Sequence, residues 1–192
     1  MIAEEVMSRA TVHPVDQIRS LYLVHGAGLR QALARLAPEL DADDLVQELF
    51  VIALSKTTEL SRTAAPHAWL YGVAVKLAFS RRRTARLRRF FRLSEVEHTA
   101  IVDSPARSVE QRDAQQRVGR ALESLTLAKR EVFVLFELQG LAGEEIAAAL
   151  RIPLKTVWTR LFHARKEMSA AIERELLAES RTSGLSRHEV EP

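Results

Sequence analysis

Apolar residues recur at intervals of three and four in both halves of the chain. The clearest series are Trp69, Val73 and Leu77, and then Val157, Leu161, Ala164 and Met168. This spacing places the side chains on one face of an α-helix. The 192 residues include only 7 glycines and 6 prolines, too few turn-forming residues for a fold of many short strands. The sequence therefore predicts an all-α fold.

The helical pattern is interrupted in the middle of the chain, where Asp103-Ser104-Pro105 is typical of a break between structural units. We expect two small helical domains, residues 15–92 and 108–178, joined by a flexible linker over residues 93–107. The last residues, 179–192, are polar, and we expect them to form a frayed tail.

The net charge of +3 conceals a strong local imbalance. Residues 81–92 contain seven arginines and no acidic residue. Arginine side chains fit phosphate oxygens, and the counterions that they displace favour binding to nucleic acid. This block is therefore a candidate phosphate-binding strip, and the alternative is a solvated helix end that leads into the linker.

The second half carries the pattern of a helix-turn-helix, over residues 143–162. A short helix with Ile146 and Leu150 on its apolar face is followed by a tight turn at residues 151–154 and by a second helix. The outward positions near the start of the second helix are Lys155, Thr156, Thr159, Arg160 and His163. Such side chains reach base edges and phosphates when the helix enters the major groove of DNA. The alternative is a plain helical hairpin with a basic exposed face.

Trp158 and Phe162 lie one turn apart on the same predicted helix. We interpret this pair as the edge of the hydrophobic core, because large aromatic side chains are mostly buried. The alternative is an exposed aromatic surface that contacts DNA, the other domain or a partner protein.

Several classes of protein are excluded or disfavoured. The chain has no cysteine, which excludes disulfides, thiolate zinc sites and iron–sulfur clusters and suits a reducing compartment. No apolar run reaches the ~18 residues of a membrane span, and the N-terminus lacks a signal pattern, so we expect a cytoplasmic protein without membrane insertion. Asp41, Asp43 and Asp44 could ligate magnesium in an enzyme, but we interpret them as the acidic start of a helix. We expect no catalytic residues, no metal and no cofactor.

Two segments together resemble a known family. Residues 121–168 (ALESLTLAKREVFVLFELQGLAGEEIAAALRIPLKTVWTRLFHARKEM) resemble the C-terminal promoter-reading domain of bacterial RNA polymerase sigma factors of the extracytoplasmic-function (ECF) type. DADDLVQELFVIAL (41–54) and HAWLYGVAVKLAFSRRR (67–83) resemble the N-terminal domain of the same family. The order of the motifs and the lack of a middle domain fit this compact two-domain group.

The resemblance implies a function: binding of core RNA polymerase, its direction to specific promoters, and opening of the minus-ten element. Docking on the clamp helices of the polymerase would involve Asp44, Leu45, Val46, Gln47, Glu48 and Phe50. The minus-ten element would be contacted by Lys56, Thr57, Arg62, His67, Trp69, Lys76, Arg81, Arg82 and Arg83. The minus-thirty-five element would be contacted by Lys155, Thr156, Trp158, Thr159, Arg160, His163 and Arg165. The implied partners are core RNA polymerase (clamp helices and flap), promoter DNA and an anti-sigma factor.

The chain departs from the family pattern at several positions. Ala142-Gly143 stands where a serine usually caps the first helix of the reading motif, and Arg151 stands where the turn commonly has glycine. Trp158 stands where the family typically has lysine, so the promoter sequence that is read should be unusual.

Two other functions fit parts of the sequence. A helix-turn-helix regulator that does not dock on polymerase would leave Asp44–Glu48 without a role. An RNA-binding module would use the arginine block but not the second half of the chain.

Overall fold

The computed structural model describes residues 14–91 and 109–185, and within this part of the chain the fold is all-helical. The elements in chain order are α1 (Pro14–Leu36), α2 (Ala42–Ser55), α3 (Thr57–Arg62), α4 (Pro66–Phe91), α5 (Val109–Ser124), α6 (Leu127–Phe133), the π-helical turn η1 (Val134–Leu138), α7 (Gly143–Leu150) and α8 (Leu154–Leu185). The prediction of an all-α fold is confirmed. The predicted linker lies outside the described residues.

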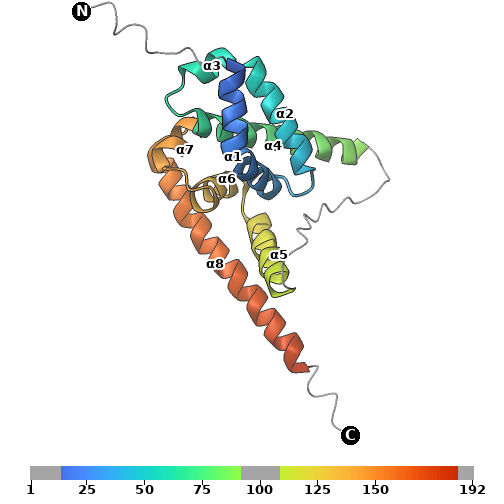
Figure 1. Ribbon diagram of the computed structural model, residues 1–192. Helices are drawn as coiled ribbons and strands as arrows, with labels where there is room; N and C mark the ends of the chain where they lie inside the picture. The colour runs from blue at the N-terminus through green and yellow to red at the C-terminus, as the bar shows by residue number, and fades with distance from the viewer. Residues whose placement is uncertain (1–13, 92–108, 186–192) are drawn as a thin grey trace, which may run out of the picture.

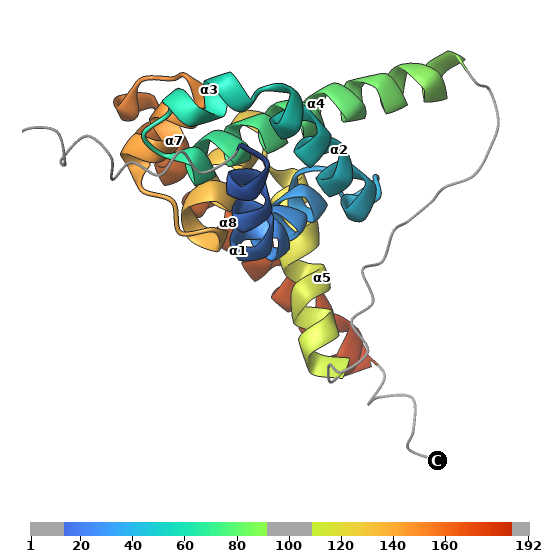
Figure 2. The ribbon, with the colours of Figure 1, turned by 45° about the horizontal axis from the view of Figure 1, so that its top comes forward.

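Helices α1 to α4 form one group and helices α5 to α8 form another (Figure 1). In the first group α1 packs against α2 and α4, and the short helix α3 joins α2 to α4. In the second group α8 packs against α5, α6 and α7 and extends well beyond the rest of the molecule (Figures 1 and 2).

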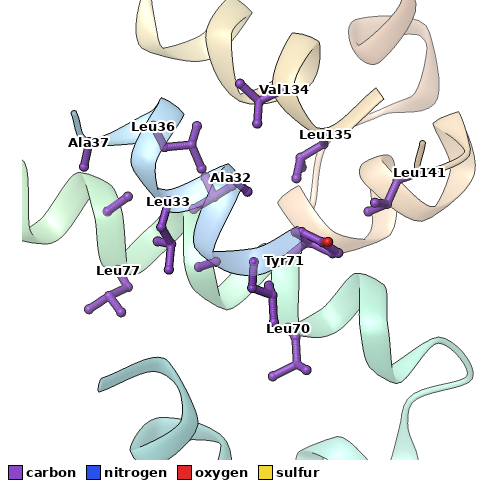
Figure 3. Close-up of a cluster of buried hydrophobic side chains, with 14 of the residues drawn as sticks. Ala32, Leu33, Leu36, Ala37, Leu70, Tyr71, Leu77, Val134, Leu135 and Leu141 are labelled. Atoms are coloured by element: carbon purple, nitrogen blue, oxygen red, sulfur yellow. The ribbon is translucent and has the colours of Figure 1, made fainter. Parts of the chain in front are cut away.

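The two groups also pack against each other. Helix α4 contacts α7, and α1 contacts η1 and α6. As a result the buried apolar side chains of both groups form one continuous cluster. Figure 3 shows Leu33 of α1, Tyr71 of α4 and Leu135 of η1 in this cluster, and all three are at least 96% buried.

Two boundaries differ from the sequence-based expectation. The segment 55–66, expected as a loop, contains the short helix α3, because Leu60 is buried beneath it and Lys56 pairs with Glu59 three residues on. Helix α8 continues to Leu185, into the expected polar tail, since its sequence there has no helix breaker before Gly184.

None of the described helices combines the length and apolar character needed to cross a bilayer.

Candidate nucleic-acid interface

A groove of about 1030 Å³ lies between α2, α3, α4 and α7. Five of the nine residues expected at the minus-ten element line it: Lys56, Arg62, Trp69, Lys76 and Arg81. The other four, Thr57, His67, Arg82 and Arg83, do not line it. Part of the expected minus-ten set therefore faces into one groove, and its role in DNA binding stays a prediction.

Some charged side chains of the groove have ion-pair partners and others do not. Lys56 Nζ donates to Glu59 Oε1 at 2.8 Å, and this hydrogen bond lowers the pKa of the Glu59 carboxyl. Arg81 Nε donates to Glu48 Oε2 at 2.8 Å, which raises the pKa of the arginine. Within the described part of the chain, Arg62 and Lys76 make no ion pair. Arg151, exposed at the end of α7, also lines the groove and has no ion pair with a described residue, so Arg62, Lys76 and Arg151 are the cations most available to phosphates.

Trp69 provides an aromatic wall on the α4 side of the groove. It is half-buried and packs against the apolar core. An aromatic face beside free cations is the arrangement that binds unpaired nucleotides, because bases stack on the ring while the cations hold the backbone.

Arg82 and His67 do not line the groove and are held by other side chains, although the partner of His67, Glu145, is itself a lining residue. Arg82 Nε lies 2.6 Å from Glu39 Oε1, and its Nη1 donates to the Leu36 carbonyl oxygen at 2.8 Å. His67 stacks on His25 with ring centroids 5.5 Å apart, and its Nε2 lies 2.9 Å from Glu145 Oε1 on α7. In this conformation both side chains serve packing between helices.

The candidate polymerase-docking helix α2 exposes only part of the predicted set. Asp44 and Gln47 are exposed and Glu48 is partly exposed. By contrast Leu45, Val46 and Phe50 are buried and belong to the core. These three residues position the helix rather than offering a surface.

Sequence reasoning missed two apolar residues on the exposed face of α2. Val51 is 65% exposed and Leu54 is 47% exposed. With Asp44 and Gln47 they follow the spacing i, i+3, i+7, i+10, so all four lie along one side of the helix. The spacing of these four residues in an otherwise apolar segment was the sequence signal that could have identified the exposed side of α2.

Two of the three aspartates at the start of α2, Asp41 and Asp43, use their side chains in structural contacts. Asp41 caps the helix by accepting hydrogen bonds from the backbone N–H groups of Asp43 and Asp44, at 2.8 and 3.1 Å. The Asp43 carboxylate receives two hydrogen bonds from Arg30, at 2.6 and 3.0 Å, which lower its pKa. No cluster of three metal-ligating side chains occurs among the described residues.

Helices α7 and α8 have the arrangement of a helix-turn-helix. The turn between them passes through Arg151, whose φ of 56° and ψ of 48° place it in the left-handed region that favours glycine. At the start of α7 no side chain caps from Ala142, but Glu145 Oε2 accepts a hydrogen bond from the Ala142 N–H at 3.0 Å.

The outward face of α8 is basic and partly aromatic. Lys155, Thr159 and His163 are exposed as expected, while Thr156 is half-buried. Phe162 is 66% exposed and packs edge-on against His163, with centroids 5.4 Å apart. The interpretation of Phe162 as a core-edge residue is therefore wrong.

Trp158 is 43% exposed, and its indole contacts two neighbouring elements. It packs edge-on against Phe136, with centroids 5.5 Å apart. A Cβ on Gly143 would lie only 2.5 Å from Trp158 Cζ2, so the ring occupies the space that a side chain at 143 would need. The two departures from the family pattern, at 143 and 158, are thus coupled through packing.

The basic side chains Arg160 and Arg165 both pair with glutamates. Arg160 Nη1 donates to Glu131 Oε1 at 2.7 Å, and Arg165 Nε donates to Glu137 Oε1 at 2.6 Å. Burial nevertheless raises the pKa of Glu131 from its ordinary value of 4.5 to about 7. Replacing Arg160 would therefore disturb the α6–α8 packing as well as any DNA contact.

The raised pKa of Glu131 predicts a pH dependence of stability. Its carboxyl binds a proton more tightly in the folded than in the unfolded chain, so the stabilisation is complete below pH 4.5 and is lost as pH rises through about 7. Relative to Glu131→Gln, the unfolding free energy of the wild type should fall by up to about 3 kcal/mol over that range. Urea titrations at several pH values measure this difference. Glu173→Gln, at an exposed position, is the control. If the unfolding free energies of the wild type and Glu131→Gln change in parallel with pH, the raised pKa is not that of Glu131.

The comparisons with known proteins agree with this geometry. Residues 21–88 match the family model for Sigma-70 region 2, and residues 115–168 match the model for Sigma-70, region 4. The chain is 31% identical over 158 residues to the RNA polymerase sigma factor CnrH of Cupriavidus metallidurans, covering 78% of this chain and 83% of that protein. It is 29% identical over 150 residues to the ECF RNA polymerase sigma-E factor of Escherichia coli K12, covering 73% and 78%.

Solved structures match over most of the chain. The sigma factor RpoE, in complex with the anti-sigma factor NepR from Bartonella quintana, superposes with a TM-score of 0.69 at 23% identity, over 82% of this chain and 97% of that one. CnrH, in complex with the cytosolic domain of CnrY, superposes with a TM-score of 0.59 at 28% identity, over 82% and 88%. The first of these likenesses supports the two-part helical fold.

The match to Sigma-70 region 2 over the first group of helices and to Sigma-70, region 4 over the second defines the class of protein, a two-part transcription factor. The chain belongs to the sigma-70 family of RNA polymerase sigma factors, in its ECF group. It is accordingly a transcription initiation factor that associates with RNA polymerase and directs it to promoters. A helix-turn-helix regulator independent of polymerase is not favoured.

Proposed function

We propose that the two helical groups divide the work of promoter recognition: α1–α4 bind the polymerase and the minus-ten element, and α5–α8 bind the minus-thirty-five element. The observation that carries this proposal is the groove beside α4, where Trp69 stands next to the unpaired cations Arg62 and Lys76. An opened base stacks on Trp69 while the cations bind the adjacent phosphates. These contacts offset the cost of unpairing, a few kcal/mol per base.

The polymerase docks on the exposed side of α2, through Gln47, Val51 and Leu54. This surface combines a polar side chain with two exposed apolar ones. Interfaces of this kind have an apolar centre that excludes water and a polar rim that sets orientation. Tyr22 of α1, 53% exposed and packed edge-on against Phe50, extends the apolar area next to this face.

The minus-thirty-five element is bound in its major groove by the start of α8. Lys155 and Thr159 contact base edges and phosphates there. Trp158 and Phe162 add apolar area that suits thymine methyl groups. An anti-sigma factor controls the chain, as the complexes of its structural neighbours suggest, and the protein acts in the cytoplasm where the polymerase is.

The experiment that tests this division is footprinting of the chain with core polymerase on a responsive promoter fragment. We expect protection of two stretches, one upstream and one around minus ten, with permanganate-reactive thymines only in the second. Trp69→Phe, which keeps a stacking face, serves as the control for Trp69→Ala. Loss of upstream protection in Trp69→Ala with unchanged thymine reactivity would contradict the assignment of the groove.

A further inference from the structure

One residue that lines the groove is an arginine in a strained backbone conformation. Arg151 follows α7, and its side chain is exposed. Its φ of 56° is the one positive φ of a non-glycine residue in the described part of the chain. Residues with a Cβ adopt this conformation at a cost in free energy, and such strained residues gather at sites that clamp ligands. The backbone at this position favours glycine, so we expect the arginine side chain to have a function of its own.

Arg151 lines the groove because α7 approaches α4 closely. A Cβ on Gly72 of α4 would lie 2.6 Å from the carbonyl oxygen of Ala149 in α7. Figures 1 and 2 both place α7 beside α3 and the start of α4. Ala148 and Ala149 line the groove together with Arg151. The end of α7 therefore forms one wall of the groove, with small side chains beside a long basic one.

Each of the three glutamates that line the groove already has a partner side chain. The pairs are Glu48 with Arg81, Glu59 with Lys56, and Glu145 with His67. Among the residues that the structure describes, Arg62, Lys76 and Arg151 form no ion pair. These three cations come from α3, from α4 and from the turn after α7. The groove therefore has positive charge left over for an anion that the chain itself does not supply.

The cations of α4 and of the turn after α7 act on the same part of the groove. The hydrogen bond from Lys56 is the main cause that lowers the pKa of the Glu59 carboxyl, and the charges of Arg151 and Lys76 lower it further. Exposed charges are screened beyond about 10 Å, so both cations lie near this carboxyl. An anion with several charges can thus contact cations from both groups of helices at once.

The groove also offers an aromatic ring and hydroxyl groups. Trp69 is half-buried, and Thr58 and Ser80 are exposed at the lining. The volume of about 1030 Å³ is at the upper end of the range for small-ligand sites, about 300–1,000 Å³. A base can stack on the indole while phosphates contact the cations. One phosphate carries at most about two charges, so three cations suit a chain of phosphates.

We propose that this groove binds a free purine nucleoside polyphosphate, with the base on Trp69 and the phosphates on Arg62, Lys76 and Arg151. The proposal concerns the chain before it meets DNA, and it does not depend on the assignment of the groove to the minus-ten element. Arg151 belongs to the helix-turn-helix and is not among the residues expected at that element. If the groove also binds opened minus-ten bases, the nucleotide competes with them for Trp69.

The first test is calorimetric titration of the full chain with four probes: ATP, AMP, adenosine and inorganic tripolyphosphate. We expect ATP to bind about tenfold tighter than tripolyphosphate, because stacking of a base on an aromatic ring supplies a factor of this size. ATP should also bind at least tenfold tighter than AMP, and adenosine should not bind measurably. Trp69→Ala should remove the difference between ATP and tripolyphosphate, and Trp69→Phe, which keeps a stacking face, should retain it.

The second test uses Arg151→Gly, a variant that removes the side chain and relieves the backbone strain. We expect ATP binding to weaken about tenfold, the effect of losing a hydrogen bond to a charged group. The thermal unfolding temperature should not fall, because glycine adopts a positive φ readily. Arg174→Ala is the control: it also removes one exposed arginine, from a part of α8 that does not line the groove, and it should bind ATP like the wild type.

Three outcomes would overturn the proposal. The first is that ATP does not bind the wild type, and the second is that ATP binds no tighter than tripolyphosphate, which would make the groove a general polyanion site. The third is that Arg151→Gly binds ATP as tightly as Arg174→Ala. The minus-ten assignment is tested separately, by the thymine reactivity of Trp69→Ala in the polymerase complex, so either proposal can fail while the other stands.

Discussion

Val51→Asp should abolish stable association with core RNA polymerase. Val51 is 65% exposed at the centre of the proposed docking face, between Gln47 and Leu54. A carboxylate there would be buried without a partner on binding, and central apolar contacts of this kind dominate affinity. We expect the affinity to fall about 100-fold or more, measured by co-purification and by competition for core enzyme.

The same substitution should leave the fold intact, because surface changes away from the core usually alter stability by no more than about 0.5 kcal/mol. Leu177→Asp is the matched control: Leu177 is 60% exposed, lies far along α8, and would receive the same charge. Undiminished co-purification of Val51→Asp would show that the polymerase docks elsewhere. Glu48 is a poorer probe of this face because its carboxylate pairs with Arg81.

Lys155→Glu should weaken binding to the upstream promoter element on the order of 10- to 100-fold. Lys155 is exposed in the first turn of α8, the position that enters the major groove in a helix-turn-helix. The charge reversal replaces a phosphate or base contact with repulsion. Removing one phosphate contact should also reduce the log–log salt slope by about 0.9. Anisotropy of the polymerase-bound protein on promoter DNA, at several salt concentrations, measures both effects.

Arg174→Glu is the control for this prediction. It reverses the same charge on the same helix, roughly 28 Å away at about 1.5 Å per residue. The prediction would be contradicted if the two variants had equal affinities and salt slopes. Arg160→Ala is also expected to weaken promoter binding, but it is a less specific test. Arg160 pairs with the buried carboxyl of Glu131, so this substitution changes the packing of α6 against α8 as well as any contact with DNA.

Local sequence patterns predicted the helices and the helix-turn-helix well. The series Val157, Leu161, Ala164 and Met168 is buried as expected, and the turn covers residues 151–153, because Leu154, expected in the turn, begins α8. The sequence did not predict helix α3, because the segment is polar and contains only one residue that is buried, Leu60. Burial of Leu60 stabilises the helix, but a single apolar residue in a polar segment predicts a loop.

Tertiary partners could not be predicted from one sequence. The pairs Arg160–Glu131 and Arg81–Glu48 are 29 and 33 residues apart, and no local pattern links them. The contact of Gly72 with the Ala149 backbone depends on the packing of two separate groups of helices. The exposure of Phe162 depends on which face of α8 the neighbouring helices cover. The sequence did contain a signal for it, because the spacing of Lys155, Thr159, Phe162 and Lys166 places Phe162 on the same face as polar residues.

The most direct test of the central claim is run-off transcription with purified core polymerase on genomic fragments, with and without this chain, followed by mapping of the start sites. The account predicts transcripts that depend on the chain and begin downstream of one shared pair of sequence elements. Start sites identical to those of core polymerase alone would contradict it.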